Sequence, residues 1–109
     1  MKTPLGRFQI AEKIGADAPP GTIFRSRLPL PPEEVPLPSD DLVLSRILWL
    51  DGVEKQNANT RDRFIYIHGT NHEDEIGQPS SHGCIRMKND DLVALFDQVP
   101  RGAEVMIEA

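Results

Sequence analysis

The segment PSSHGCIRMKNDD, residues 79–91, contains the single cysteine of this 109-residue chain, Cys84. A lone cysteine is most often a small buried hydrophobic residue. Here the residues before it are loop formers, and no apolar periodicity leads into it. Arg86 and Lys88 lie close in sequence and would favour a thiolate electrostatically. These neighbours indicate a nucleophilic cysteine on a loop.

Two histidines are candidate bases for that thiol. Period two along an expected strand at residues 63–68 places Tyr66 and His68 on one face, with isoleucines on the core face. His68 ends the strand, a rigid position with an open edge that suits a catalytic base, although a plain surface histidine is the alternative. His82 precedes Cys84 by two residues. A cysteine–histidine pair is the minimum for thiol acyl transfer, and a glycine turn before the cysteine can direct backbone N–H groups toward an oxyanion.

The same residue types could also bind zinc, since His68, His72, His82 and Cys84 are four possible ligands. The spacing of His68 and His72 pairs ligands only on a helix, whereas this segment is expected to be a strand followed by a loop. The sequence contains no CxxC and no HExxH pattern. We therefore expect no metal and no cofactor. We interpret His72 as a solvated loop residue, with a lid or substrate-gating role as the alternative.

Short strands and one helix are expected to position these residues. Residues 42–50 are apolar nearly throughout, so both faces of that strand should be covered. Asn89 is a favourable N-cap for a helix with one apolar face. A tight turn is expected at residues 3–6 and a long polar loop at residues 54–62. The other expected strands are residues 7–14, 22–25, 63–68 and 103–107.

Length and composition limit the class of protein. The length fits one domain over residues 1–109. The net charge of −5 gives no basic footprint, which argues against a nucleic-acid partner. No apolar run is long enough for a membrane span, and residues 1–15 lack a signal-peptide pattern. Residues 19–38 hold seven of the ten prolines, which predicts a surface excursion.

The order of these motifs resembles a known family. His68-Gly69-Thr70, a loop, and then the run from Ser81 to Met87 (SHGCIRM) are similar to the signature of the L,D-transpeptidase catalytic domain. The segment TPLGRF at residues 3–8 is similar to the TPxGxF segment of that family. The resemblance covers residues 3 to about 107. It implies a mainly β, mixed-sheet, sandwich-like fold with one α-helix after the cysteine loop.

The resemblance also implies roles for individual residues. Cys84 matches the nucleophile, His68 the general base, and Gly69 the position whose backbone orients that base. His82 and Gly83 match the motif residues beside the nucleophile, and the N–H groups of Gly83 and Cys84 match the oxyanion-hole donors. Arg46, which interrupts an apolar strand, either forms a structural ion pair or reaches the site. The candidates for substrate binding are Arg86, Tyr66, Ser81 and Arg46. For Arg86, which stands where the family has Asn or Arg, the alternative to holding a carboxylate is bracing the loop.

The implied reaction is acyl transfer on peptidoglycan tetrapeptide stems. The Cys84 thiolate attacks the carbonyl of the L-centre of meso-diaminopimelate, D-alanine leaves, and an amine acceptor resolves the thioester while His68 moves the proton. Water as acceptor would make an L,D-carboxypeptidase, and a non-catalytic cell-wall-binding remnant of the fold is a further alternative.

Two features depart from the family pattern. The family's first strands have no counterpart before Thr3, so three alternatives are open: a truncated or mis-started product, a degenerate paralogue, or a chain that completes its sheet by forming a dimer. Family members act in the periplasm or cell envelope, which is the expected location here, although the sequence as written carries no export signal. On that ground alone the chain would be cytosolic or a piece of a longer precursor.

Overall fold

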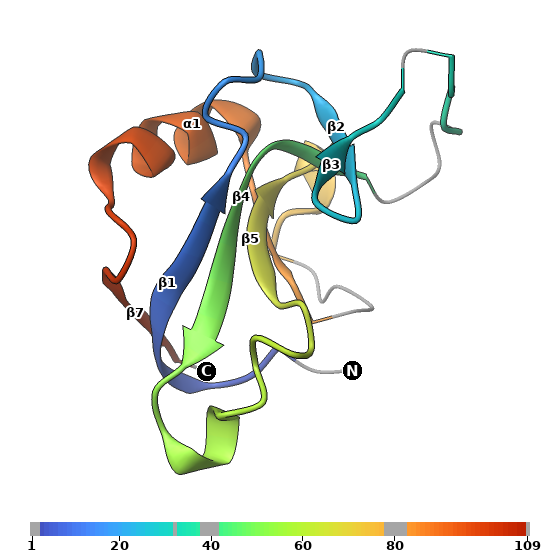
Figure 1. Cartoon of the computed structure of the whole chain (residues 1–109). Coiled ribbons are helices and arrows are strands. Elements are labelled where there is room, and N and C mark those ends of the chain that lie inside the picture. Colours follow the sequence, from blue (N-terminus) through green and yellow to red (C-terminus); the bar gives the residue numbers. More distant parts are fainter. Residues whose placement is uncertain (1–2, 32, 38–41, 78–82, 109) are drawn as a thin grey trace.

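The computed structural model describes residues 3–31, 33–37, 42–77 and 83–108. In this part of the chain, all strands belong to one seven-stranded sheet, with β4 (Val43–Gly52) at its centre (Figure 1). Strand β4 pairs antiparallel with β1 (Gly6–Ile14) and with β5 (Tyr66–Gly69). One α-helix, α1 (Asn89–Gln98), follows the cysteine motif. The prediction of a mainly β fold with a helix after the cysteine loop is confirmed.

Shorter strands extend the sheet on each side. Strand β7 (Glu104–Ile107) pairs with β1, and β2 (Ile23–Arg25) pairs with the start of β4 and with the edge strand β3 (Leu28–Pro29). These pairs are antiparallel. Strand β6 (Ile85–Met87) pairs with β5 in parallel, which makes the sheet mixed.

The two faces of the sheet carry separate apolar clusters. The α1 cluster lies between the sheet and α1, and it consists of Phe8, Ile10, Leu48, Leu50, Ile65, Ile67, Leu92 and Phe96. The second cluster consists of Phe24, Ile47 and Tyr66, with Trp49 and Cys84 packed against it. Because neighbouring residues of a strand point to opposite faces, β4 contributes to both clusters. The prediction that both faces of this strand are covered is confirmed.

The surface excursion predicted for residues 19–38 begins only after β3, because β2 and β3 lie within that range and belong to the sheet. After β3, the chain leaves the sheet at one corner and runs as a loop (Figure 1). Val35 and Leu37 are exposed in this excursion. None of the helices within the described residues is long and apolar enough to cross a bilayer.

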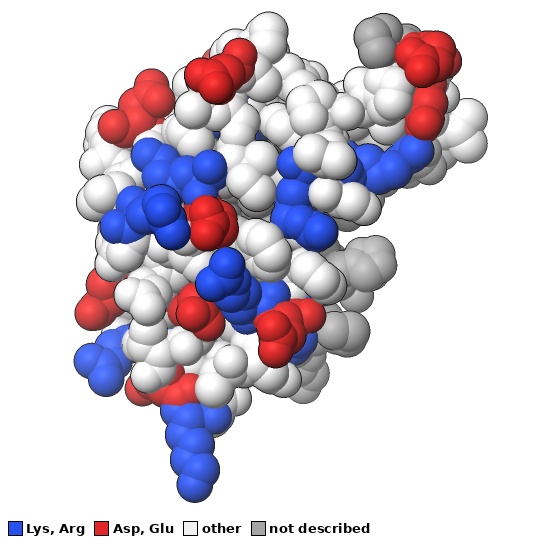
Figure 2. Space-filling model, in the orientation of Figure 1, with Lys and Arg blue, Asp and Glu red and all other residues white. Residues whose placement is uncertain are grey.

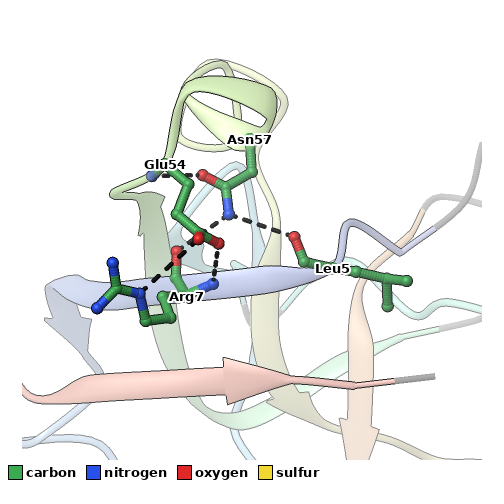
Figure 3. A network of polar contacts seen from close by, with 4 residues as sticks. All are labelled: Leu5, Arg7, Glu54 and Asn57. Carbon is green, nitrogen blue, oxygen red and sulfur yellow. Dashed lines mark hydrogen bonds and ion pairs between the residues drawn. The ribbon is translucent and has the colours of Figure 1, made fainter.

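The loop after β4 is an internal anchor rather than a solvated connection. It contains the 3-10 helix η1 (Lys55–Asn57), whose last residue, Asn57, is only 2% exposed. The Asn57 amide donates to the carbonyl oxygens of Leu5 (3.3 Å) and Arg7 (3.0 Å), and its Oδ1 accepts from the backbone N–H of Glu54 at 2.9 Å (Figure 3). The buried amide therefore joins the loop to the beginning of β1.

The contacts of this loop with β1 explain why residue 6, at the end of the TPLG segment, is a glycine. The Glu54 carboxylate accepts from the backbone N–H of Arg7 at 2.7 Å (Figure 3). Gly6 has φ of +111°, and a Cβ there would lie 2.2 Å from Oε1 of Glu54. The predicted turn at residues 3–6 is wrong: residues 3–5 carry no turn and β1 already begins at Gly6, because Asn57 holds the backbone on both sides of that glycine.

The strand that carries the candidate base is shorter at its start than predicted. Phe64 has φ of +56° and lies in a turn, so β5 begins at Tyr66 rather than at residue 63. The predicted division of faces is confirmed, because Ile65 and Ile67 lie in the α1 cluster. The strand reaches Gly69 and ends there.

Candidate active site

The parallel pair β5–β6 brings the histidine strand and the cysteine motif together. Ile67 lies beside Ile85, and both contact the α1 cluster. Their sequence neighbours therefore point to the opposite face, where His68 and Cys84 lie on adjacent segments. From strand spacing and rise per residue, two Cα atoms at such diagonal positions are about 8 Å apart, a distance that side chains span. Residues 16 positions apart in sequence thus share one face.

The Cys84 sulfur is held by backbone groups at the start of β5. Its Sγ lies 3.4 Å from the carbonyl oxygen of Phe64 and 3.4 Å from the backbone nitrogen of Tyr66. The neutral thiol donates to the carbonyl and accepts from the N–H group. When the proton leaves, the Tyr66 N–H remains as a donor that stabilises negative charge on the sulfur.

The residue before the cysteine turns the chain toward this position. Gly83 is buried and has φ of +84°, a left-handed conformation that glycine adopts without steric cost. Ser81 and His82 lie outside the described residues, so their roles remain predictions.

The His68 imidazole is buried and has a defined tautomer. It is 4% exposed, and its Nδ1 lies 2.6 Å from the carbonyl oxygen of Gly69. A carbonyl can only accept a hydrogen bond, so Nδ1 carries the proton. The Nε2 lone pair is then the basic position of the ring.

Gly69 also allows a close approach of the following helix. A Cβ at this position would lie 2.1 Å from Oδ1 of Asn89 and 2.7 Å from the carbonyl oxygen of Leu44. The absence of a side chain therefore lets β4 and α1 contact the backbone that orients His68.

Asn89 does not cap α1 with its side chain, and that prediction is wrong. It is the first residue of the helix, while Lys88 occupies the N-cap position. The Asn89 amide instead donates to the carbonyl of Thr70 at 2.8 Å, and its Oδ1 accepts from the Ser45 hydroxyl at 2.7 Å. The cap comes from Glu73, whose Oε2 accepts from the Asn89 backbone N–H at 2.7 Å and from its Nδ2 at 2.9 Å.

These contacts explain the titration of Glu73. Hydrogen bonds from the backbone and then from the side chain of Asn89 hold the pKa of that carboxyl below its ordinary value of 4.5, and Lys88 acts in the same direction. Carboxylates are favourable at helix N-termini for the same reason. The carboxylate joins the loop after His68 to the helix after the cysteine motif.

The Arg86 side chain contacts the same loop. Its register partner on β5 is His68, and the side chain is 7% exposed. Its Nη2 donates to the backbone carbonyl of Glu75 at 3.3 Å, and its Nη1 lies 3.9 Å from the carboxylate of that residue. Glu75 also lies 3.1 Å from Nδ1 of His72. The contacts within the described residues place Arg86 against the 3-10 helix η2 (Glu73–Glu75).

Tyr66 belongs to an aromatic group beside the cysteine. Its ring lies edge-on to Trp49, with centroids 5.7 Å apart, and Trp49 is also 5.7 Å from Phe64. The Arg27 and Arg61 guanidinium groups lie 5.1 and 5.3 Å from the Trp49 ring. The Tyr66 hydroxyl accepts from Nη1 of Arg27 at 2.9 Å. No local pattern in the sequence marked Arg27, because it comes from a separate hairpin.

Arg46 points away from the cysteine. Its Nη1 donates to the carbonyls of Ala18 (2.9 Å) and Ser45 (2.6 Å), and its guanidinium lies 5.5 Å from the Phe96 ring in the α1 cluster. The structure therefore does not bring Arg46 together with Cys84, which packs against the cluster on the other face. The alternative of an ion pair is not met among the described residues, where Arg46 has backbone carbonyls as partners.

Part of this chain is similar to proteins that are named as L,D-transpeptidases. YqjB of Bacillus subtilis (strain 168), named as an L,D-transpeptidase, is 50% identical over 52 residues, which are 47% of this chain and 30% of YqjB. ErfK/SrfK of Salmonella typhimurium, with a name of the same kind, is 53% identical over 45 residues, 41% of this chain and 15% of that protein. YbiS of Escherichia coli (strain K12), also so named, is 49% identical over 43 residues, 39% of this chain and 14% of that protein.

The similar segments thus cover less than a third of each of these relatives. The match to the family model covers nearly the whole chain. The family model described as the L,D-transpeptidase catalytic domain (YkuD) matches residues 1–107. This chain belongs to the L,D-transpeptidase catalytic domain family.

Proposed function

We propose that this chain is a cysteine-dependent L,D-transpeptidase that acts on peptidoglycan stem peptides, with Cys84 as nucleophile and His68 as general base. One structural observation supports this proposal in addition to family membership. The parallel pairing of β5 with β6 puts the buried histidine and the cysteine on the same face of adjacent segments. Thiol acyl transfer requires a nucleophile and a base within reach of each other, and a shared face on adjacent segments supports this.

In the first half-reaction, Nε2 of His68 accepts the proton of the Cys84 thiol. The thiolate attacks the carbonyl carbon at the L-centre of the donor's meso-diaminopimelate residue, and the oxyanion is bound by the N–H groups of Gly83 and Cys84. The C–N bond then breaks. The departing D-alanine amine takes the proton from the imidazolium, which leaves a thioester on the sulfur.

In the second half-reaction, an acceptor amine attacks the thioester carbonyl. His68 takes the proton of that amine, the C–S bond breaks, and the proton returns to the Cys84 sulfur. The hydrogen bond from His68 Nδ1 to the Gly69 carbonyl supports both steps, because it keeps Nε2 as the basic nitrogen throughout. The backbone N–H of Tyr66 stabilises the negative charge on the Cys84 sulfur by hydrogen bonding.

A carbapenem tests the nucleophile, because its strained ring acylates a reactive thiol. We expect wild-type protein to gain one drug mass at Cys84 and the Cys84→Ala variant to gain none. His68→Gln should slow labelling by about 10²-fold or more, the usual scale of a lost general base. His72→Gln is the matched control, because His72 contacts the η2 carboxylate Glu75, and its labelling should match wild type.

The proposal fails if wild-type protein stays unlabelled under conditions that fully label an active family member. Separate analysis of the products made with and without an amine acceptor distinguishes transfer from hydrolysis by water.

The proposed substrate is in the cell envelope, so we propose that the protein acts there. Fractionation of cells that produce the tagged natural protein would check this location. A dimer that completes the sheet remains our proposal for the assembly, and light scattering would measure it.

A further inference from the structure

The hairpin between β2 and β3 carries an arginine that the proposed reaction does not use. Ser26 and Arg27 are the two residues between these strands, with φ of +50° and +68°. A two-residue turn with both φ values positive normally contains Asn and Gly, because a Cβ is unfavourable there. Strain of this kind persists where the surrounding contacts hold it, often at functional sites.

The turn directs Arg27 toward the cysteine face. Its Nη1 donates to the Tyr66 hydroxyl at 2.9 Å, and its guanidinium lies 4.9 Å from the Phe64 ring and 5.1 Å from the Trp49 ring. The other end of Tyr66, its backbone N–H, contacts Sγ of Cys84 at 3.4 Å. The length of one tyrosine therefore separates the guanidinium from the sulfur.

The charge of Arg27 has no carboxylate partner among the described residues. Its neighbours differ, because Arg25 pairs with Glu34 and Arg61 pairs with Glu12 at 3.6 Å. Arg27 is partly buried, so its charge is less hydrated than that of an exposed arginine. A guanidinium in this setting forms strong, geometrically defined hydrogen bonds with a carboxylate.

A groove provides room for a ligand beside this arginine. It has a volume of about 580 Å³ and is lined by Arg27, by the apolar side chains of Ile14, Ala18 and Phe24, and by Asp17, among others. Figure 2 shows basic side chains gathered over the β2–β3 hairpin. A groove whose lining combines apolar side chains with the cations Arg27 and Lys13 suits an aliphatic side chain that terminates in an acid.

We propose that Arg27 is a specificity-determining residue that binds the far carboxylate of the donor's diaminopimelate side chain. The inference rests on the proposed function. The carboxylate of the leaving D-alanine is too close to the scissile bond to span the length of Tyr66. The far carboxylate is separated from the reacting carbonyl by a methylene chain of similar length to a tyrosine. The donor is then held at both ends, with its carbonyl at Cys84 and its acid at Arg27.

The test measures binding in the Cys84→Ala background, where no turnover occurs. Two tetrapeptide donors are compared by calorimetry, one with the far carboxylate free and one with it amidated. We expect the free acid to bind about tenfold or more tightly, the scale of a charge-assisted hydrogen bond. Adding Arg27→Gln should bring the ratio of the two dissociation constants close to one, mainly by weakening the free acid. Arg27→Lys should be intermediate, because lysine keeps the charge but not the planar fork.

Arg61→Gln is the matched control. It removes a guanidinium from the same Trp49 ring, but that group already pairs with Glu12. The ratio should therefore stay at its original value. If Arg27→Gln weakens both peptides equally, or if neither peptide binds, the inference is wrong and Arg27 only braces the hairpin on the aromatic rings. The carbapenem labelling above is independent of this ratio, so failure of the catalytic proposal is recognised separately.

Discussion

Oε2 of Glu73 lies 2.7 Å from the backbone nitrogen of Asn89, so a residue of the loop after the histidine strand caps the helix after the cysteine motif. The same helix residue contacts the backbone beside His68 through its side chain, which donates to Thr70 at 2.8 Å. One capping interaction thus joins the segments that carry the proposed base and nucleophile.

The Glu73 cap should make stability depend on pH in a defined direction. The folded-state pKa of Glu73 is lowered below 4.5, so the carboxylate stabilises the folded state above that pH. This contribution is lost as the pH falls through the folded-state pKa. Urea unfolding of wild type and Glu73→Gln should therefore show a difference in the free energy of unfolding at pH 7 that shrinks steadily below pH 4.5.

Asp74→Asn is the control for this measurement. Asp74 lies in the same 3-10 helix but has no hydrogen bond or ion pair in the described part of the chain. Its variant should follow the wild-type pH profile. Equal profiles for Glu73→Gln and Asp74→Asn would show that the cap does not contribute.

Removing the Asn89 amide should destabilise the fold. Asn89→Ala leaves the Ser45 hydroxyl and the Thr70 carbonyl without their partner. An unsatisfied group of this kind costs about 1–3 kcal/mol. Chemical denaturation should show a loss of this size, whereas Asn59→Ala, at an exposed asparagine, should stay within about 0.5 kcal/mol of wild type. A loss no larger than that of Asn59→Ala would argue against the network.

Alanine at Gly69 should be poorly tolerated. Its Cβ would lie 2.1 Å from Asn89 Oδ1 and 2.7 Å from a backbone oxygen of Leu44, so strand β4 or helix α1 must move. Overpacking that displaces backbone costs about 1–3 kcal/mol. The same measurement on Gly21→Ala gives the cost of a positive φ without a steric clash, because Gly21 has φ of +90° and no atom within 4 Å of the added carbon, whereas the cost at Gly69 is steric. Gly69→Ala should lose more stability and also slow carbapenem labelling.

A charge at Asn57 should be worse than a truncation. The Asn57 side-chain nitrogen donates to two backbone carbonyls. Asn57→Asp places a carboxylate against those oxygens in a buried position, whereas Asn57→Ala only removes the bonds. Both variants should lose about 1–3 kcal/mol or more. The Asp variant should be the less stable at pH 7 and should approach the Ala variant as acid neutralises it. A stable Asp variant at pH 7 would contradict this role.

Much of the fold was accessible from local patterns. Alternation along residues 63–68 correctly assigned Ile65 and Ile67 to the core, because a strand exposes alternate residues whatever it pairs with. The apolar run at residues 42–50 correctly indicated a strand covered on both faces. The prediction of a turn at residues 3–6 was wrong, because a side chain more than fifty positions away holds that backbone.

Residue types and short spacings were enough to indicate the family, the main strands, the helix, and Cys84 and His68 as candidate catalytic residues. The residues that surround these two candidates follow from the three-dimensional packing of the chain. The pairing of β5 with β6 places His68 and Cys84 on one face, and Glu73 rather than Asn89 caps the helix. Arg46 contacts Phe96 of α1, and Arg27 contacts Tyr66 from the β2–β3 hairpin. Such contacts join residues far apart in the chain, and their geometry follows from strand register and packing, which no local pattern encodes.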